Sequence, residues 1–154
     1  MTKLEVLARC PSIRQLDEEQ LGKLAEICVE EVYEVGDSLC KQGRTQGKLF
    51  LIAEGLVGVY LEVGPMTERL LQSASNFEVI GWSSILPPYR CTATVKAIES
   101  TKVLAFDGRE LTELCEQNPV IGLKVYRGLA SLIAVRLRNA FTQLMGVTSM
   151  DYES

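Results

Sequence analysis

Histidine is absent from the 154-residue sequence, and its absence excludes several kinds of active site. No Ser-His or Cys-His dyad can form, no imidazole can act as a general base, and histidine can hold no metal ion. The acidic residues Glu54, Glu62, Glu78 and Asp107 stand at predicted turns and strand ends without the spacing of metal ligands. We therefore expect neither a catalytic site nor a metal site, and we expect that the protein is not an enzyme.

Long apolar runs and an excess of positive charge are also missing. No apolar run approaches the roughly 18–20 residues that a membrane-spanning helix needs. Lys3, Glu5 and Arg9 interrupt the N-terminal stretch where a signal peptide would have its apolar core. Sixteen Lys and Arg against twenty Asp and Glu give a net charge of −4, which disfavours binding to nucleic-acid phosphates. These features predict a cytoplasmic protein without direct contact to a membrane or to nucleic acid.

Cysteine is present but forms no recognisable motif. The five cysteines are Cys10, Cys28, Cys40, Cys91 and Cys115, and no two of them form a CxxC pair. This spacing excludes a zinc knuckle and a thioredoxin-like site. In a cytoplasmic protein we expect reduced and mostly buried thiols. An alternative applies to Cys91, which follows Arg90 and could act as a redox sensor with a lowered thiol pKa.

The residues that are present predict one mainly β domain with flanking helices, over 1–154. Leu16, Leu21 and Leu24 recur at helical spacing behind Asp17, a good N-cap, and predict a helix over about 16–29. Short runs rich in Val, Ile, Tyr and Phe, separated by Gly-containing turns, predict a β-roll over about 32–106. Helices return over about 107–145, with Pro119 at the start of the second.

The segment from Pro119 to about Met145 predicts one long helix with an apolar stripe. Such a helix is longer than a β-roll of this size can cover, so we expect a homodimer formed through the C-terminal helix; the alternative is a helix folded back on its own roll. We interpret Arg127, Arg136 and Arg138 as its solvated face or the rim of the dimer. The candidate dimer residues are Val125, Leu129, Leu132, Ile133, Leu137 and Phe141.

Three motifs in this order resemble one family. They are EVYEVGDSLCKQG, KLFLIAEGLVGVY and VIGWSSILPPYRCTATVKAIESTKVLAFDGREL, followed by helices similar to a lid and a dimer helix. The chain thus resembles the cyclic-nucleotide-binding domain of the catabolite-activator and protein-kinase-A regulatory type, from about Leu16 to Leu144. The resemblance implies a jelly-roll-like β-roll, with the third motif as the phosphate-binding cassette.

The cassette departs from the family's pattern at two positions. In nucleotide-binding members a Gly-Glu pair opens a short helix and the Glu holds the ribose, whereas here Trp82 follows Gly81. An Arg that pairs with the cyclic phosphate is expected before the ThrAlaThrVal run, but Cys91 stands there. Arg90 lies one residue too early, and in extended backbone it points to the opposite face, unless a bulge re-aims it.

These departures predict a non-enzymatic regulatory or interaction module that does not bind cAMP or cGMP in the usual way. Because few residues follow the long helix, we expect no DNA-binding domain, and any effector is a separate protein. The alternative is a sensor of a cyclic nucleotide or another small anion. It would bind through Arg90 and the backbone of Gly81–Ser84, and it would signal through the C-terminal helix. The candidate ligand-binding residues are Gly81, Trp82, Ser83, Ser84, Arg90, Cys91 and Thr92.

Overall fold

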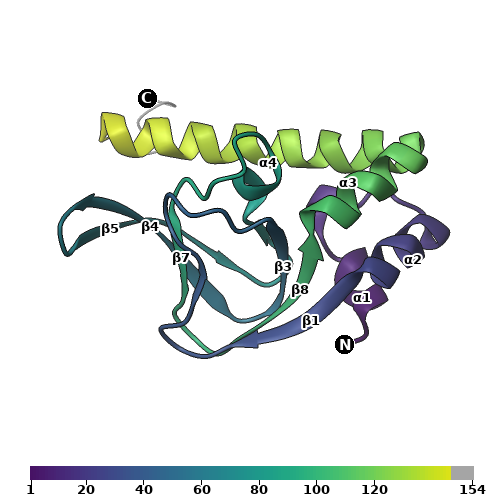
Figure 1. The fold of residues 1–154 in the computed structure, drawn as a ribbon, viewed down its shortest axis with the longest axis horizontal. Helices are drawn as coiled ribbons and strands as arrows, with labels where there is room; N and C mark the ends of the chain where they lie inside the picture. The colour runs from purple at the N-terminus through teal and green to yellow at the C-terminus, as the bar shows by residue number, and fades with distance from the viewer. Residues whose placement is uncertain (147–154) are drawn as a thin grey trace, which may run out of the picture.

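Two antiparallel sheets form a β-roll, and helices cover one side of it (Figure 1). The computed structural model describes residues 1–146, without the side chain of Ser84. One sheet has the strand order β1-β8-β3-β6 and the other β2-β7-β4-β5. The strands are β1 Cys28–Tyr33, β2 Ser38–Cys40, β3 Lys48–Glu54, β4 Leu56–Gly64, β5 Thr67–Ser75, β6 Val79–Ile80, β7 Thr94–Ala97 and β8 Thr101–Asp107.

Apart from the 3₁₀ turn at 82–85, the helices stand at the two ends of the sequence, and they pack against the outer face of the first sheet. The mainly β fold with flanking helices is therefore confirmed. None of the helices in residues 1–146 combines the length and apolar character needed to cross a bilayer. The helices are α1 Lys3–Ala8, η1 Pro11–Ile13, α2 Glu18–Ile27, η2 Trp82–Ile85, α3 Gly108–Gln117 and α4 Pro119–Met145, of which η1 and η2 are 3₁₀ turns.

The helix starts follow the capping residues that the sequence indicates. The Asp17 carboxylate accepts from Gln20 N at 2.8 Å, and Asp17 N donates back to Gln20 Oε1 at 3.0 Å, a complete capping box. Asp107 accepts from Arg109 N and Glu110 N at the start of α3. Pro119 opens α4, which ends at Met145 as predicted.

The N-terminal part differs from the prediction. The predicted helix over 16–29 ends at Ile27, because Cys28 already pairs with Phe106 as the first residue of β1. The β-roll therefore starts before 32. The segment ahead of α2, which the sequence left unassigned, folds as α1 and η1. Residues 147–154 of the predicted domain lie outside the described part of the chain.

The central strands β3 and β8 are buried on both faces. From β3, Leu49 and Leu51 pack among the helices, while Phe50 and Ile52 point into the roll between the sheets. Period-two alternation sends neighbouring side chains to opposite faces, so a continuous apolar run such as Leu49–Ala53 suits a strand with two packed faces. One strand pair thereby joins the helical core to the core of the roll.

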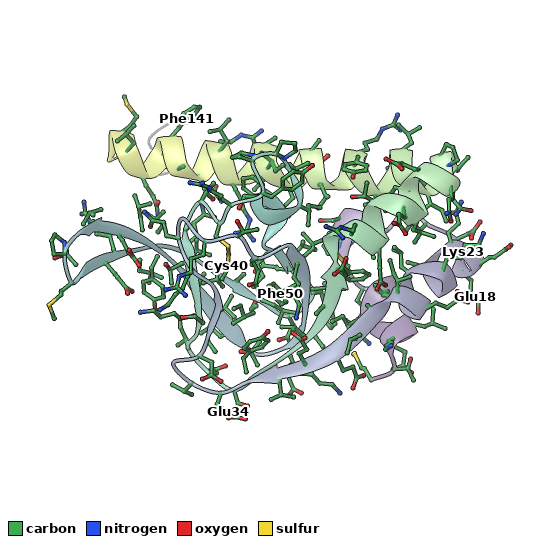
Figure 2. The ribbon with its side chains drawn as sticks, in the orientation of Figure 1. Glu18, Lys23, Glu34, Cys40, Phe50 and Phe141 are labelled. Carbon is green, nitrogen blue, oxygen red and sulfur yellow. A yellow bond between two sulfur atoms is a disulfide. The ribbon has the colours of Figure 1, made fainter. Side chains whose placement is uncertain are left out.

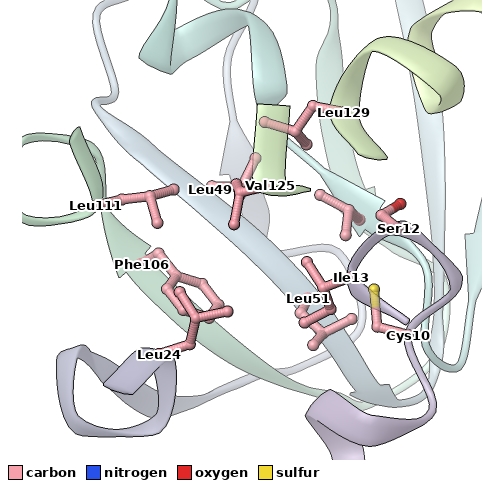
Figure 3. A pocket seen from close by; sticks show the side chains of 11 residues that line it. Cys10, Ser12, Ile13, Leu24, Leu49, Leu51, Phe106, Leu111, Val125 and Leu129 are labelled. Carbon is pink, nitrogen blue, oxygen red and sulfur yellow. The ribbon is translucent and has the colours of Figure 1, made fainter. Parts of the chain in front are cut away.

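A small cavity of about 30 Å³ remains where the helices meet this sheet. Figure 3 shows Val125 and Leu129 of α4 approaching Leu49 of β3 and Phe106 of β8 around it. Its walls are almost entirely apolar, and its volume is about that of one water molecule in the liquid. We interpret it as a packing gap and not as a ligand site.

α4 approaches the backbone of η1 closely at Gly128. A Cβ placed on Gly128 would lie 1.6 Å from the carbonyl oxygen of Ser12 in η1. Only glycine lets the two backbones meet at this distance, which explains a residue that lowers helix propensity in the middle of a long helix.

Replacing Gly128 by alanine is expected to destabilise the fold by about 1–3 kcal/mol, the ordinary cost of overpacking, because η1 or α4 must move away. Urea unfolding followed by circular dichroism measures the change. Gly22→Ala in α2 is the matched control: nothing lies within 4 Å of its added Cβ, so it is expected to stabilise the protein. Equal stability of the two variants would contradict the close contact at Gly128.

Candidate functional site

The predicted cassette folds as a tight turn, a single 3₁₀ turn and an extended return. Gly81 follows β6 with a φ of +83°, and a Cβ there would lie 2.9 Å from the carbonyl oxygen of Lys48 and 3.3 Å from Phe50 Cδ2. Both the left-handed backbone and the crowding require glycine. Trp82–Ile85 then forms η2, and the chain returns through Pro87 and Pro88 to Arg90.

A pocket lies between this cassette, the second sheet and α4. Its volume of about 340 Å³ falls in the range of small-molecule sites. Four of the predicted ligand residues, Gly81, Trp82, Ser83 and Thr92, line it, and Figure 2 shows Cys40 inside the roll beneath α4. The other lining residues are Val59, Leu71, Gln72, Ile80, Ala93, Val95, Ile133, Arg136, Leu137 and Ala140.

The polar groups that the cassette brings to the pocket are mainly hydroxyls. Ser83 Oγ accepts from Thr92 N at 3.3 Å and lies 3.4 Å from Thr92 Oγ1, so these two residues close the turn. Trp82 is half-buried and packs against the helical core as well as lining the pocket. The side chain of Ser84 lies outside the described part of the structure.

Arg90 and Cys91 point to opposite sides of the extended return, as alternation requires. Arg90 is exposed, bridges to Thr45, and does not line the pocket. Cys91 is 2% exposed, and its backbone bonds to Arg44 O and Gly43 N. No bulge brings the Arg90 side chain into the pocket.

Cys91 forms a disulfide with Cys40 of β2, 51 residues away. The expectation of five reduced thiols is therefore wrong for this pair, and so is the hypothesis of a free, acidic Cys91 thiol. Local spacing could not predict the bond, because a disulfide depends on Cα atoms that the fold brings together. The three free cysteines, Cys10, Cys28 and Cys115, are buried as expected, and burial raises the pKa of each thiol.

Arg136 is the residue that the sequence analysis misassigned. It does not lie on the solvated face of α4, because its guanidinium is turned toward the roll, where Nη2 donates to Val79 O at 3.0 Å. Burial lowers the pKa of Arg136, with the nearby Glu78 acting in the opposite direction. A signal was available: position 136 follows Leu129, Leu132 and Ile133 by seven, four and three residues, on the apolar stripe.

The predicted dimer residues divide along α4. Val125 and Leu129 are buried in the protein's own core, and Leu132 and Ile133 are partly buried. Leu137 and Phe141 remain 51% and 55% exposed. The first half of the stripe thus follows the alternative of a helix folded back on its own chain, and only the second half is open to a partner.

Among residues 1–146, no three Cys, Asp or Glu side chains lie close enough together to hold a metal ion. The pocket is instead a mostly apolar recess with hydroxyls on one wall and one arginine on another. It can surround a small organic molecule, and its only lining cation comes from the helix that covers it.

Two curated proteins named for cyclic nucleotides are similar to this chain. The chain is 26% identical over 145 residues to human cGMP-dependent protein kinase 2, covering 91% of this chain and 18% of the kinase. It is 27% identical over 134 residues to the cyclic AMP receptor protein of Thermus thermophilus, covering 87% of this chain and 60% of that protein. Both are longer, and the chain spans less than two thirds of either.

A solved structure of similar extent also matches. A Geobacter metallireducens protein described as cyclic nucleotide-binding superposes with a TM-score of 0.76 at 26% identity, over 89% of this chain and 99% of the other. The family model of the cyclic nucleotide-binding domain matches residues 30–118, from β1 to the residue before α4. The chain belongs to the cyclic nucleotide-binding domain family.

Proposed function

We propose that this chain is a non-enzymatic regulatory module whose pocket does not bind cAMP or cGMP in the usual way. The observation that carries the proposal is the state of Cys91. The family resemblance expects the phosphate-binding Arg at this position, but the side chain here is buried and bonded to Cys40. A disulfide has no N–H group or positive charge to offer a phosphate, and Arg90 is directed to the surface.

The second family contact is replaced as well. Trp82 stands where the resemblance expects the ribose-binding Glu, and an indole N–H cannot accept a hydrogen bond from a hydroxyl. Hydrogen bonds to charged groups contribute about 1.5–3 kcal/mol each. Losing both is expected to weaken cyclic-nucleotide binding by about 10²–10⁴-fold.

We propose that the module forms a homodimer through the second half of α4 and that this dimer transmits its signal. Leu137, Phe141 and Leu144 are 51%, 55% and 84% exposed along this half, and Leu70 of β5 adds a further exposed apolar side chain. Covering such a row is favourable in water, and a second copy of the same helix offers a matching surface. An effector protein would then read the position of this paired helix.

A second candidate function is a sensor of a different small ligand. It is favoured by the pocket itself, which remains open at about 340 Å³ although both family contacts are gone. Trp82 lines this space without filling it. A recess of this size is large enough for a small organic molecule.

The first test is calorimetric titration of the protein with cAMP and cGMP. The wild-type chain is expected to give no saturable heat at millimolar nucleotide. The variant Trp82→Glu/Cys91→Arg/Cys40→Ala, which restores both family contacts, is expected to gain binding because the carboxylate and guanidinium return to their places. Saturable micromolar binding by the wild type would overturn the proposal.

The matched control is Cys40→Ala/Cys91→Ala, which removes the disulfide without adding a charge. It is expected to stay silent like the wild type. Binding by this control would show that the disulfide, and not the missing arginine, keeps nucleotides out. Its thermal melting curve also shows whether the roll folds without the bond.

The dimer is tested with Phe141→Glu, which places a charge in the exposed half of the stripe. Light scattering after gel filtration is expected to show a dimer for the wild type and a monomer for the variant. Asn139→Glu is the control, because residue 139 lies on nearly the opposite side of the helix from 141. A monomeric wild-type protein, or a variant that stays dimeric, would contradict pairing through this surface.

A further inference from the structure

Arg136 places a half-buried positive charge against the pocket, with Glu78 nearby but not in an ion pair with it. Its Nε is the one buried side-chain nitrogen or oxygen atom without a hydrogen-bond partner among the described residues. The ion pairs in that part of the chain join Lys48 to Glu31, Lys96 to Glu68 and Lys102 to Glu30, and none involves Arg136. A buried N–H group without an acceptor is unfavourable, and an anion placed beside Arg136 Nε would supply that acceptor.

The residues around Arg136 indicate the chemistry that the rest of a ligand must have. Apolar side chains from both sides of the pocket, including Ile80, Trp82 and Ile133, would surround an apolar body. Ser83, Thr92 and Gln72 add neutral polar groups, and no Asp or Glu is among the lining residues. One cation in an apolar recess suits a single negative charge on an apolar body. A phosphate dianion would need a second charge partner, and a cyclic nucleotide, although it is a monoanion, would need more polar partners for its ribose and phosphate oxygens.

We propose that this pocket binds a small organic carboxylate with an apolar body, and that the Arg136 guanidinium pairs with its carboxylate. The inference rests on the second candidate function above and supplies the ligand class that it requires. The positive charge that pairs with the ligand carboxylate then belongs to α4, the helix that covers the pocket, and not to the cassette. Ligand recognition and the position of α4 thereby depend on one side chain.

The hydrogen bonds of Arg136 show how binding would act on α4. Nη2 is held by the Val79 carbonyl of β6, and the main-chain oxygen of Arg136 accepts from Gln72 Nε2 of β5 at 3.4 Å. Gln143 Nε2, further along α4, donates to Leu71 O. Val79 O holds only one of the five guanidinium N–H groups, so a carboxylate that engages Nε–H links α4 to the ligand as well as to β6. Binding therefore favours helix positions that let Arg136 face the ligand, through differential affinity.

The probes are benzoate, phenylacetate and 1-naphthoate, each beside its neutral amide. Trp82 is the only tryptophan and lines the pocket, so its fluorescence reports entry, and calorimetry gives the dissociation constant. At least one carboxylate is expected to bind the wild-type chain saturably and more tightly than its amide. Arg136→Met is expected to weaken that binding by about 10–100-fold, the worth of one charge-assisted hydrogen bond.

Arg138→Met is the matched control, because Arg138 is exposed on the same helix and does not line the pocket. It is expected to bind like the wild type, and Arg136→Lys keeps the charge should Arg136→Met fold poorly. The proposal is overturned if no carboxylate binds at millimolar concentration, if acid and amide bind equally, or if Arg136→Met binds like Arg138→Met. None of these outcomes bears on the cAMP and cGMP titration, which decides the proposed function separately.

Discussion

Burial of β3 and β8 on both faces is the constraint on which the rest of the structure depends. Leu49 and Leu51 face the helices and Phe50 and Ile52 face the roll, so neither core can shift without disturbing the other. The same strand also fixes the cassette, because the Gly81 turn rests against the Lys48 carbonyl and the Phe50 ring. The cassette wall of the pocket is therefore held in place by β3, and another wall is set by α4.

Local signals were sufficient for much of the fold. Asp17, Asp107 and Pro119 mark helix starts through capping and through the fixed φ of proline, and both act within a few residues. Period-two alternation also separates buried Cys91 from exposed Arg90. The boundary at Cys28 was harder, because its apolar side chain fits a helical stripe equally well and only pairing with Phe106 makes it a strand residue.

The features that the sequence did not reveal are long-range. The bond between Cys40 and Cys91 spans 51 residues and depends on how β2 meets the cassette. Arg136 was assigned to solvent because a charge on a helix usually lies there, although its register matched the buried stripe. Its side chain turns inward because a pocket lies beneath α4. The sequence of α4 alone does not indicate that pocket. Long-range packing therefore decides both differences at the site: the disulfide at Cys91, where an arginine was expected, and the position of Arg136 beside the pocket.

The close contact of Gly128 with Ser12 holds α4 at one point along its length, and the helix can pivot about that point. Arg136 lies eight residues beyond it and Met145 seventeen, which at 1.5 Å per residue corresponds to arms of about 12 Å and 25 Å. If the helix pivots there as a rigid rod, a displacement at Arg136 is roughly doubled at the C-terminal end. A displacement of the helix axis at Arg136 by the length of a hydrogen bond, ~3 Å, then becomes a shift as large as one helical turn at Met145.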